Sequence, residues 1–298
     1  MLVEAYLTYI RCELNLSVST VLCYKEALFD WANYATDGKP ENLEPFDMTV
    51  SDLRLWIANL ADKGLKPRSL RLKIQALRGF YRYLARYHGA KSNPAAELTL
   101  AKTDKSLPVY VRRSEMVELL TEKPEDSTNF ISCRNLLILT LFYETGIRCS
   151  ELMTLRDAAV DTVKGELKVL GKRNKERIVP FGTGLAEQIE RYRTLRNETT
   201  GHGVEMMFVR RDGSQMSRIQ IYRIVRNAMQ EHGVNAQRKS PHILRHTFAT
   251  DMVNNGADLT AVQKLLGHVS LSTTQIYTHA SFRELQEVYN RSHPRERN

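Results

Sequence analysis

Hydrophobic residues in the first third of the chain recur at helical spacing, in four stretches separated by turn-forming and cap-forming residues. They predict helices over residues 2–14, from a cap at Ser17 or Ser19 to about 36, from 49 to 61, and from just after 67–69 to about 87. The next stretch, residues 88–108, is rich in small and charged side chains and is interrupted by prolines. It has the composition of a linker, and we place the domain boundary after residue 103.

The rest of the chain mixes two periodicities. Alternating hydrophobic and polar residues predict strands over 166–170 and 177–181, joined by the polar turn 171–175, and a further strand over 206–209. Helical spacing predicts helices from about 114 and over 133–144, 185–196, 219–231, 241–256, 258–267 and 282–291. We therefore expect a helical first domain, residues 1–103. The second domain, residues 104–298, should be α+β, mostly helical with a small antiparallel sheet and a C-terminal tail helix.

Composition limits the classes of binding partner and the cell compartment to be expected for this chain. The chain has 298 residues, suited to two domains, and a formal net charge of +9, which favours a polyanion such as nucleic acid but also fits a merely soluble basic protein. The longest apolar run, residues 136–143, is far shorter than the roughly 20 residues that span a membrane. The four scattered cysteines favour reduced thiols over disulfides or zinc. We expect a soluble cytoplasmic protein without a membrane partner.

A basic helix is the first candidate for binding nucleic acid. Nine lysines and arginines, and no acidic residue, lie between Lys63 and Lys91, and five of the arginines fall within one sector of the predicted helix. A solvated surface helix usually interleaves acids with its bases, so backbone phosphates are the better explanation. The candidate contacts are Lys66, Arg68, Arg71, Lys73, Arg78, Arg82 and Arg86.

Four short segments of the second domain carry groups suited to a phosphodiester. They are residues 145–152 with Arg148 and Glu151, the turn 171–175 with Lys172, residues 241–246 with His242 and Arg245, and residues 267–279 with His268 and Tyr277. Singly, each residue has an ordinary structural explanation. His242 and His246 are spaced for a metal, but no carboxylate accompanies them, so we predict no metal site.

Together these segments resemble the tyrosine recombinase (phage integrase) family, with its Arg, Lys, His-x-x-Arg, His and Tyr in that order. Residues 67–84 are similar to the family's helical, SAM-like core-binding domain, and residues 267–279 and 282–294 resemble the bacterial Xer site-specific recombinases. Two positions, Ile243 and Asp251, depart from the residues expected in Xer relatives. Neither is expected to carry chemistry.

The resemblance implies an enzyme that cleaves and rejoins DNA through a 3′-phosphotyrosyl intermediate, without metal, ATP or another cofactor. Arginine suits such a site because its planar fork matches two phosphoryl oxygens and stays charged. In the implied roles, Lys172 protonates the leaving 5′ oxygen, His242 assists proton transfer and His268 binds the phosphate. The implied catalytic set is Arg148, Lys172, His242, Arg245, His268 and the nucleophile Tyr277, with Glu151 in support and Arg173 and Lys175 as further DNA contacts.

Partners and biological role follow from the resemblance alone. It implies double-stranded DNA, a tetramer of recombinase protomers with the 282–291 segment docked on a neighbour, a possible second paralogous recombinase and an FtsK-type DNA translocase. Chromosome dimer resolution is the leading hypothesis. The alternatives are a phage or transposable-element recombinase of the same chemistry, a type IB topoisomerase-like relaxing enzyme, and a non-catalytic DNA-binding factor on this scaffold.

Overall fold

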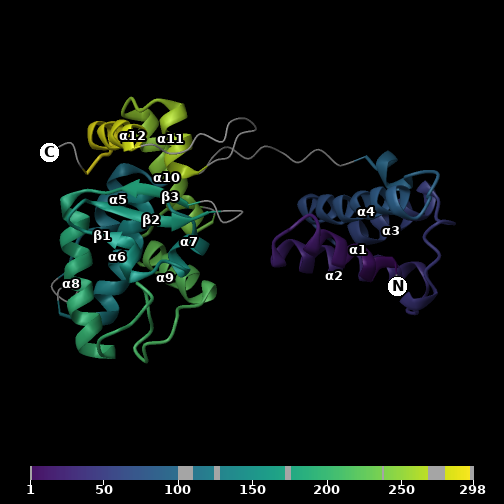
Figure 1. Cartoon of the computed structure of the whole chain (residues 1–298), viewed down its shortest axis with the longest axis horizontal. Helices are drawn as coiled ribbons and strands as arrows, with labels where there is room; N and C mark the ends of the chain where they lie inside the picture. Colours follow the sequence, from purple (N-terminus) through teal and green to yellow (C-terminus); the bar gives the residue numbers. More distant parts are fainter. Residues whose placement is uncertain are drawn as a thin grey trace. The chain divides into compact units, whose positions relative to one another are not determined.

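The computed structural model describes residues 2–99, 110–123, 128–171, 176–236, 238–267 and 279–295, leaving aside the side chains of residues 279–284. The chain forms two compact units, Met1–Ser106 and Leu107–Asn298, whose elements are labelled in Figure 1. Each unit has its own hydrophobic core. Within the described ranges, no helix combines the length and the apolar composition that a membrane crossing requires.

The first unit contains the four predicted helices and two short 3₁₀ helices. Local sequence sets the starts of three of these α-helices: Ser17 caps one, Thr49 and Asp52 form a capping box for another, and Pro67 occupies the first turn of the longest. The elements are α1 Leu2–Cys12, α2 Val18–Ala35, η1 Pro40–Asn42, α3 Val50–Asp62, α4 Pro67–Tyr87 and η2 Pro94–Glu97.

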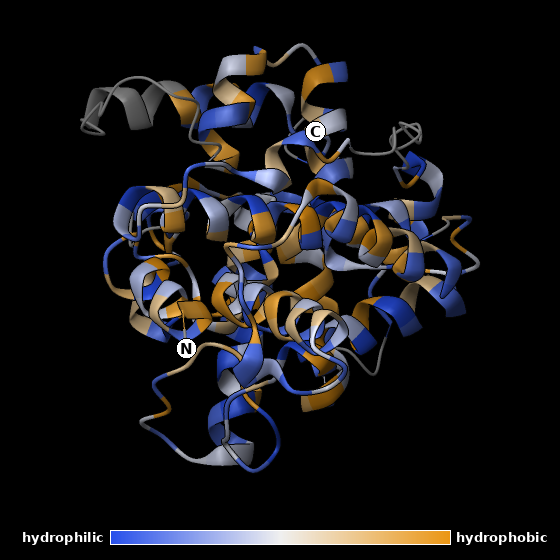
Figure 2. Cartoon of the chain, turned by 90° about the vertical axis from the view of Figure 1, so that its right-hand side faces the viewer, coloured by the Kyte–Doolittle hydropathy of each residue, from blue (hydrophilic) through white to orange (hydrophobic). Residues whose placement is uncertain are grey.

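Aromatic side chains form the centre of the first core. Trp31 of α2, Trp56 of α3 and Phe80 of α4 are all buried, and the rings of Trp31 and Phe80 meet edge to face with centroids 6.0 Å apart. Hydrophobic residues accordingly lie along one face of the helices and hydrophilic residues along the other (Figure 2). These contacts fix α4 in the unit by its apolar face.

The segment after α4 corrects the linker interpretation. Ala95 and Leu98 are buried in the first core, so the chain remains part of this unit at least as far as Leu98. Arg78 holds the segment there. Its guanidinium donates hydrogen bonds to the carbonyl oxygens of Ala95 (3.0 Å), Ala96 (3.2 Å) and Leu98 (2.7 Å).

The second unit packs helices around a small sheet. Strands β1, β2 and β3 are antiparallel in that order, with Leu167 of β2 opposite Val179 of β3, as the two predicted strands require. The predicted strand over 206–209 is wrong: Met206 and Val209 make only single bridges, to Arg156 and Gln215. The elements are α5 Arg113–Leu119, α6 Phe130–Thr145, α7 Cys149–Met153, η4 Asp157–Ala159, β1 Val160–Asp161, β2 Glu166–Leu170, β3 Glu176–Pro180, α8 Thr183–Thr200, α9 Arg218–Glu231, α10 Pro241–Asn254, α11 Leu259–Leu266 and α12 His279–Ser292.

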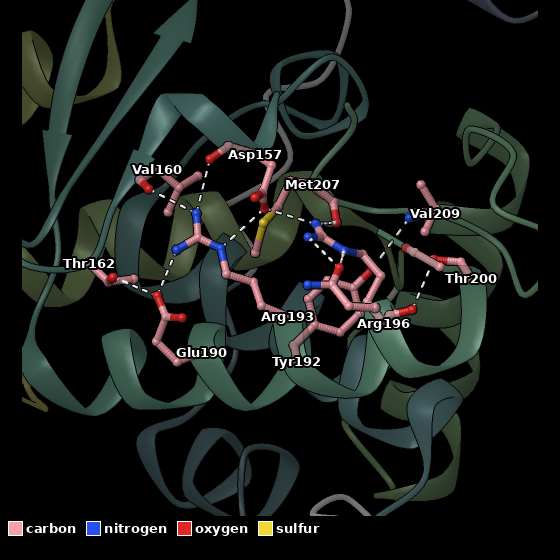
Figure 3. A network of polar contacts seen from close by, with 12 residues as sticks. Asp157, Val160, Thr162, Glu190, Tyr192, Arg193, Arg196, Thr200, Met207 and Val209 are labelled. Carbon is pink, nitrogen blue, oxygen red and sulfur yellow. Dashed lines mark hydrogen bonds and ion pairs between the residues drawn. The ribbon is translucent and has the colours of Figure 1, made fainter. Parts of the chain in front are cut away.

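Helix α6 is the central element of this unit. It is buried on nearly all sides, which fits its almost uniformly apolar sequence. Helix α8 is tied to the sheet by a polar network (Figure 3), in which Arg193 and Arg196 both bind the carboxylate of Asp157, at 3.1 Å and 2.8 Å. Arg193 also donates to the carbonyl of Val160, and Arg196 to that of Met207. This network stabilises the scaffold on which α6 and the sheet are held.

The C-terminal helix α12 packs on its own unit. Tyr289 is fully buried beside Phe248 and Met252 of α10, and Asn255 donates a hydrogen bond to the carbonyl of Ser292 at 3.0 Å. In this single chain the segment packs on its own unit, and docking on a neighbouring protomer stays a prediction. The described apolar residues of α12 are covered by α10 and α11.

His293, which directly follows α12, is buried against aromatic rings of the second unit and is neutral. It stacks on Tyr289 with centroids 4.9 Å apart and also meets the rings of Phe248 and Tyr143. Burial, reinforced by the charge of Arg295, lowers the pKa of His293 to about 3. An unfolded chain would bind a proton at this residue near pH 6.5, so between pH 6.5 and 3 the unfolded state holds more protons than the folded state.

We therefore expect this residue to make the second unit less stable in acid. Its contribution is full above pH 6.5 and falls by about 1.4 kcal/mol for each pH unit below that. Urea unfolding of the wild type and of His293→Phe, measured at pH 7.5 and pH 5, tests this. The difference between the two proteins should change by about 2 kcal/mol, because phenylalanine keeps the ring and removes the titration. Equal pH dependence of both proteins would contradict it.

Candidate active site

A tight turn after α6 places Arg148 at the start of α7. The turn uses the left-handed conformation of Gly146, with φ +60°, and a side chain there would come within 2.5 Å of the ring of Phe248. Glycine is thus required both by the backbone angle and by the approach of α10. Arg148 follows two residues later as the N-cap of α7, so the end of one buried helix fixes its backbone.

Glu151 holds Arg148 in place through two contacts. Its carboxylate, which is 2% exposed, accepts a hydrogen bond from the Arg148 backbone nitrogen at 2.7 Å and another from Arg148 Nη1 at 2.8 Å. The contact predicted between these two residues is therefore present. The Arg148 guanidinium remains partly open to solvent, with 30% of the side chain exposed.

Helix α10 presents His242 and Arg245 one turn apart. Arg245 is buried, and its guanidinium donates to the carbonyl oxygens of Gly146 and Leu266, the latter at 2.6 Å. Arg148 donates to the carbonyl of Gly267, the next residue, at 3.0 Å. Two guanidinium groups that are 97 positions apart in the sequence therefore meet at adjacent peptide carbonyls where α11 ends.

The electrostatics of this cluster favour an anion. Burial, together with the charges of Arg148 and Arg177, lowers the pKa of Arg245 to about 9. Burial and the neighbouring arginines Arg218, Arg245 and Arg148 also lower the pKa of His242, which keeps its ring neutral near pH 7. Such shifts mark a site with excess positive charge, which a bound anion would relieve.

The other predicted site residues fall beyond what the structure describes. Lys172, Arg173 and Lys175 belong to residues 172–175, and His268 and Tyr277 to residues 268–278; both segments lie outside the described residues. Their sequence neighbours are described: β2 and β3 flank the first segment, and Gly267 and α12 flank the second. The assignments of these five residues stay predictions.

Arg177 of β3 is a member of the cluster that the sequence analysis missed. Its side chain is 5% exposed, and it donates to both carboxylate oxygens of Glu151, at 2.6 Å and 2.9 Å. A signal for it was present, because alternation along the predicted strand places residues 177, 179 and 181 on one face. Val179 and Phe181 are apolar, so that face is buried and an arginine on it needs a buried partner.

Helix α9 contributes a second basic surface that the sequence analysis missed. An open depression of about 480 Å³ lies along it, next to the segment leading into α10, and its lining is Arg218, Ile219, Tyr222, Arg223, Arg226 and Lys239. The Arg218 guanidinium lies over the Tyr222 ring, 5.3 Å from its centroid, and the rings of Tyr222 and His242 are 6.5 Å apart. The spacing of Arg218, Tyr222 and Arg226, four residues each, was the available signal.

The basic residues of α4 and of its N-cap, Lys66, divide into exposed ones and ones held by contacts inside the first unit. Lys73 pairs with Asp30 of α2 at 2.5 Å and lies over the Trp56 ring, and Arg78 binds the carbonyls after α4. Lys73 is therefore not an uncompensated charge, because Asp30 pairs with it. Arg78 keeps its positive charge, but carbonyl oxygens occupy its donors. The five exposed members, which remain open to solvent, are Lys66, Arg68, Arg71, Arg82 and Arg86.

Family models match both units. Residues 110–284 match the model described as "Phage integrase family", and residues 3–88 match "Phage integrase, N-terminal SAM-like domain". The second unit of the chain thus corresponds to one model and the helical first unit to the other. The predicted fold class, a SAM-like helical domain together with a mostly helical α+β domain, is confirmed.

Curated relatives match over almost the full length. The chain is 37% identical to "Tyrosine recombinase XerC" of Oceanobacillus iheyensis, covering 98% of this chain and 96% of the relative. It is 35% identical to "Tyrosine recombinase XerD" of Staphylococcus aureus, covering 99% of both. Among solved structures, the XerH recombinase in a pre-cleavage complex with its difH substrate has the same fold, with a TM-score of 0.68, 22% identity, and coverage of 96% of this chain and 82% of that one.

Proposed function

Because this chain belongs to the phage integrase family of tyrosine recombinases, which are DNA strand-transferring site-specific recombinases, we propose that it cleaves and rejoins double-stranded DNA through a covalent 3′-phosphotyrosyl bond to Tyr277. We further propose that its role is Xer-like resolution of chromosome dimers in the cytoplasm. Similarity to both XerC and XerD over nearly the whole chain supports this role.

The observation that carries the chemistry is the meeting of Arg148 and Arg245 at the carbonyls of Gly267 and Leu266. Two planar forks at one point can bind the nonbridging oxygens of one phosphate and stabilise the charge that develops as the phosphorus is attacked. In sequence, the same point directly precedes His268 and lies ten residues before Tyr277. The excess positive charge there matches a phosphodiester.

The proposed reaction balances without a cofactor. The Tyr277 oxygen bonds to phosphorus while the bond from phosphorus to the 5′ oxygen breaks. The phenol loses its proton and the 5′ oxygen gains one. Neutral His242 is suited to assist the first transfer, because its lowered pKa leaves a free ring nitrogen near pH 7, and Lys172 would donate the second proton. Attack by another 5′ hydroxyl on the phosphotyrosine reverses these steps and joins a new strand.

Trapping the covalent intermediate tests this proposal. DNA attached to the protein in cells is recovered and sequenced, and a nicked duplex carrying that sequence is incubated with purified protein in EDTA. The nick lets the 5′ fragment diffuse away, so a protein–DNA adduct should accumulate on a denaturing gel. A protein that binds this duplex without forming adduct would be a DNA-binding factor on the recombinase scaffold. Recovery of one chromosomal locus, rather than mobile-element ends, supports dimer resolution.

The exposed cations of α4 and of α9 are proposed to contact DNA phosphates, and Arg173 and Lys175 are proposed to add to them. On α4, Arg71→Gln combined with Arg82→Gln should weaken binding and reduce the slope of log K against log salt by about 2, because each lost phosphate contact removes roughly one counterion. Fluorescence titration of a duplex at several salt concentrations measures this.

A matched control removes the same number of charges elsewhere in the first unit. Arg11 and Lys39 are exposed and lie outside α4. Arg11→Gln with Lys39→Gln should leave most of the salt slope intact. If both double variants lower the slope equally, only the net charge of the unit matters, and α4 is not the contact surface.

The resemblance to Xer recombinases also supports the remaining partners. We propose that protomers assemble on DNA as a tetramer, with a second paralogous recombinase and an FtsK-type translocase as candidate partners. The cis-packed α12 buries Tyr289 and His293 against α10. A tail that exchanged between protomers would therefore first have to leave this site.

A further inference from the structure

We propose that Arg177 is a positioning residue for DNA cleavage: it occupies the carboxylate of Glu151, so that Glu151 orients Arg148 without cancelling the positive charge that Arg148 offers to the phosphate. This inference rests on the proposed function. It concerns a residue that is outside the predicted catalytic set and that does not touch the phosphate itself.

The hydrogen bonds to the Glu151 carboxylate are divided equally between the two arginines. Each of its two carboxylate oxygens accepts one hydrogen bond from Arg177 and one from Arg148. Arg177 binds both oxygens through its terminal nitrogens, the strongest geometry for such a pair. Arg148 uses its backbone and only one guanidinium nitrogen, which leaves Nη2 to bind Gly267.

Charge explains why a second arginine is needed. With Glu151 alone, Arg148 would sit in a neutral ion pair, and a neutral pair attracts a phosphate weakly. The described cluster instead contains three guanidinium groups, on Arg148, Arg177 and Arg245, around one carboxylate. Burial acts to raise the pKa of Glu151, but the hydrogen bonds and charges of Arg177 and Arg148 outweigh it and hold that pKa below its usual range. Glu151 is therefore ionised and shared, and an excess of positive charge remains.

Arg177 also joins the parts that carry the site. Its Nε donates to the carbonyl of Leu265 at 2.9 Å, and its side chain passes so close to Gly267 that a Cβ there would lie 3.1 Å from it. Gly267 has a positive φ of +64°, which favours glycine, and the Arg177 side chain leaves little room for a Cβ there. Strand β3, the start of α7 and the end of α11 thus meet on one buried guanidinium.

A stabilising role alone does not account for this arrangement. Burying an ion pair costs desolvation energy that its attraction often fails to recover, and apolar replacements are frequently as stable. Within the described residues, moreover, the hydrogen bonds to the Glu151 carboxylate all come from Arg148 or Arg177. The arrangement instead fixes the orientation of Arg148 and keeps its positive charge available.

Three variants test the idea on the nicked duplex described above. Arg177→Met removes the shared charge and should slow adduct formation by about 10–100-fold, the order seen when a metal ligand loses the residue that orients it. DNA affinity should change by no more than a few-fold. Arg177→Met with Glu151→Gln restores the net charge of the cluster and should recover a large part of the rate. Arg177→Lys should fall between the wild type and Arg177→Met, because lysine keeps the charge and loses the paired geometry.

Arg196→Met is the matched control, since Arg196 is equally buried and ion-paired, but with Asp157 in the network of Figure 3. It should lose stability and keep its cleavage rate per folded molecule. The proposal is overturned if the double variant folds but cleaves no faster than Arg177→Met. It is also overturned if Arg177→Met fails to fold and the double variant is inactive. A wild type that forms no adduct would instead contradict the proposed function.

Discussion

Tyr277→Phe is expected to abolish the covalent protein–DNA adduct, with a loss of roughly 10⁴–10⁶-fold or more, the order seen when a covalent catalyst loses its nucleophile. The substitution removes only the phenolic oxygen, which is the atom that would bond to phosphorus. DNA affinity should stay within about twofold, because the basic surfaces of α4 and α9 are untouched. Adduct formation on the nicked duplex, scored on a denaturing gel, measures the first effect, and titration of the same duplex the second.

The control for this experiment is Tyr110→Phe, which removes the same atom from an exposed tyrosine in the second unit. It should form adduct at the wild-type rate. Adduct of normal yield from Tyr277→Phe would show that another residue attacks the phosphate, while the arginine cluster could still bind it. Loss of both DNA binding and adduct formation would point to a folding defect, which a thermal melt of the variant would detect.

Local patterns predicted most of the helices, because an apolar stripe and a capping residue act within a few turns. Helix α4 begins at Pro67, slightly before its predicted start, and ends at Tyr87 as expected. The chain after α4 was harder, since small and charged residues are typical of linkers. Its place in the first core depends on three carbonyls that bind Arg78, about twenty residues earlier, and no local pattern carries that information.

The candidate site likewise combines contacts that local spacing predicts with contacts that depend on the fold. The spacing of three between Arg148 and Glu151 predicted their contact, which forms at the start of α7, where the N3 residue Glu151 reaches back to its N-cap Arg148. The pairing of Lys73 with Asp30, and of Arg177 with Glu151, joins separate elements and becomes visible only in three dimensions. Cations paired across separate elements were therefore the hardest to predict: the pairing of Lys73 with Asp30 was not foreseen, and Arg177 was overlooked.

Arg245→Lys is expected to slow adduct formation by roughly 10²–10³-fold at pH 7, as the loss of one charge-stabilising donor does in other enzymes. Arg245 holds the carbonyls of Gly146 and Leu266 with two nitrogens, and a single ammonium group cannot reproduce that fork. The surroundings that lower the pKa of Arg245 to about 9 would also lower that of a lysine, whose ordinary pKa is about 10.4. The variant should therefore carry less charge than arginine near neutral pH.

This difference in charge predicts the direction in which the rate of the variant changes with pH. In Arg245→Lys, the rate relative to wild type should rise as the pH is lowered from about 8 to 6, because protonation restores the missing charge. Arg134→Lys is the control: Arg134 and Arg245 have the same exposed fraction, 8%, and Arg134 likewise binds a carbonyl, that of Val209, outside the cluster. It should lose stability without a change in cleavage rate per folded molecule. If both lysine variants cleave alike at every pH, the charge of Arg245 does not act on the phosphate, and its hydrogen bonds serve only to join α10 to the turn after α6.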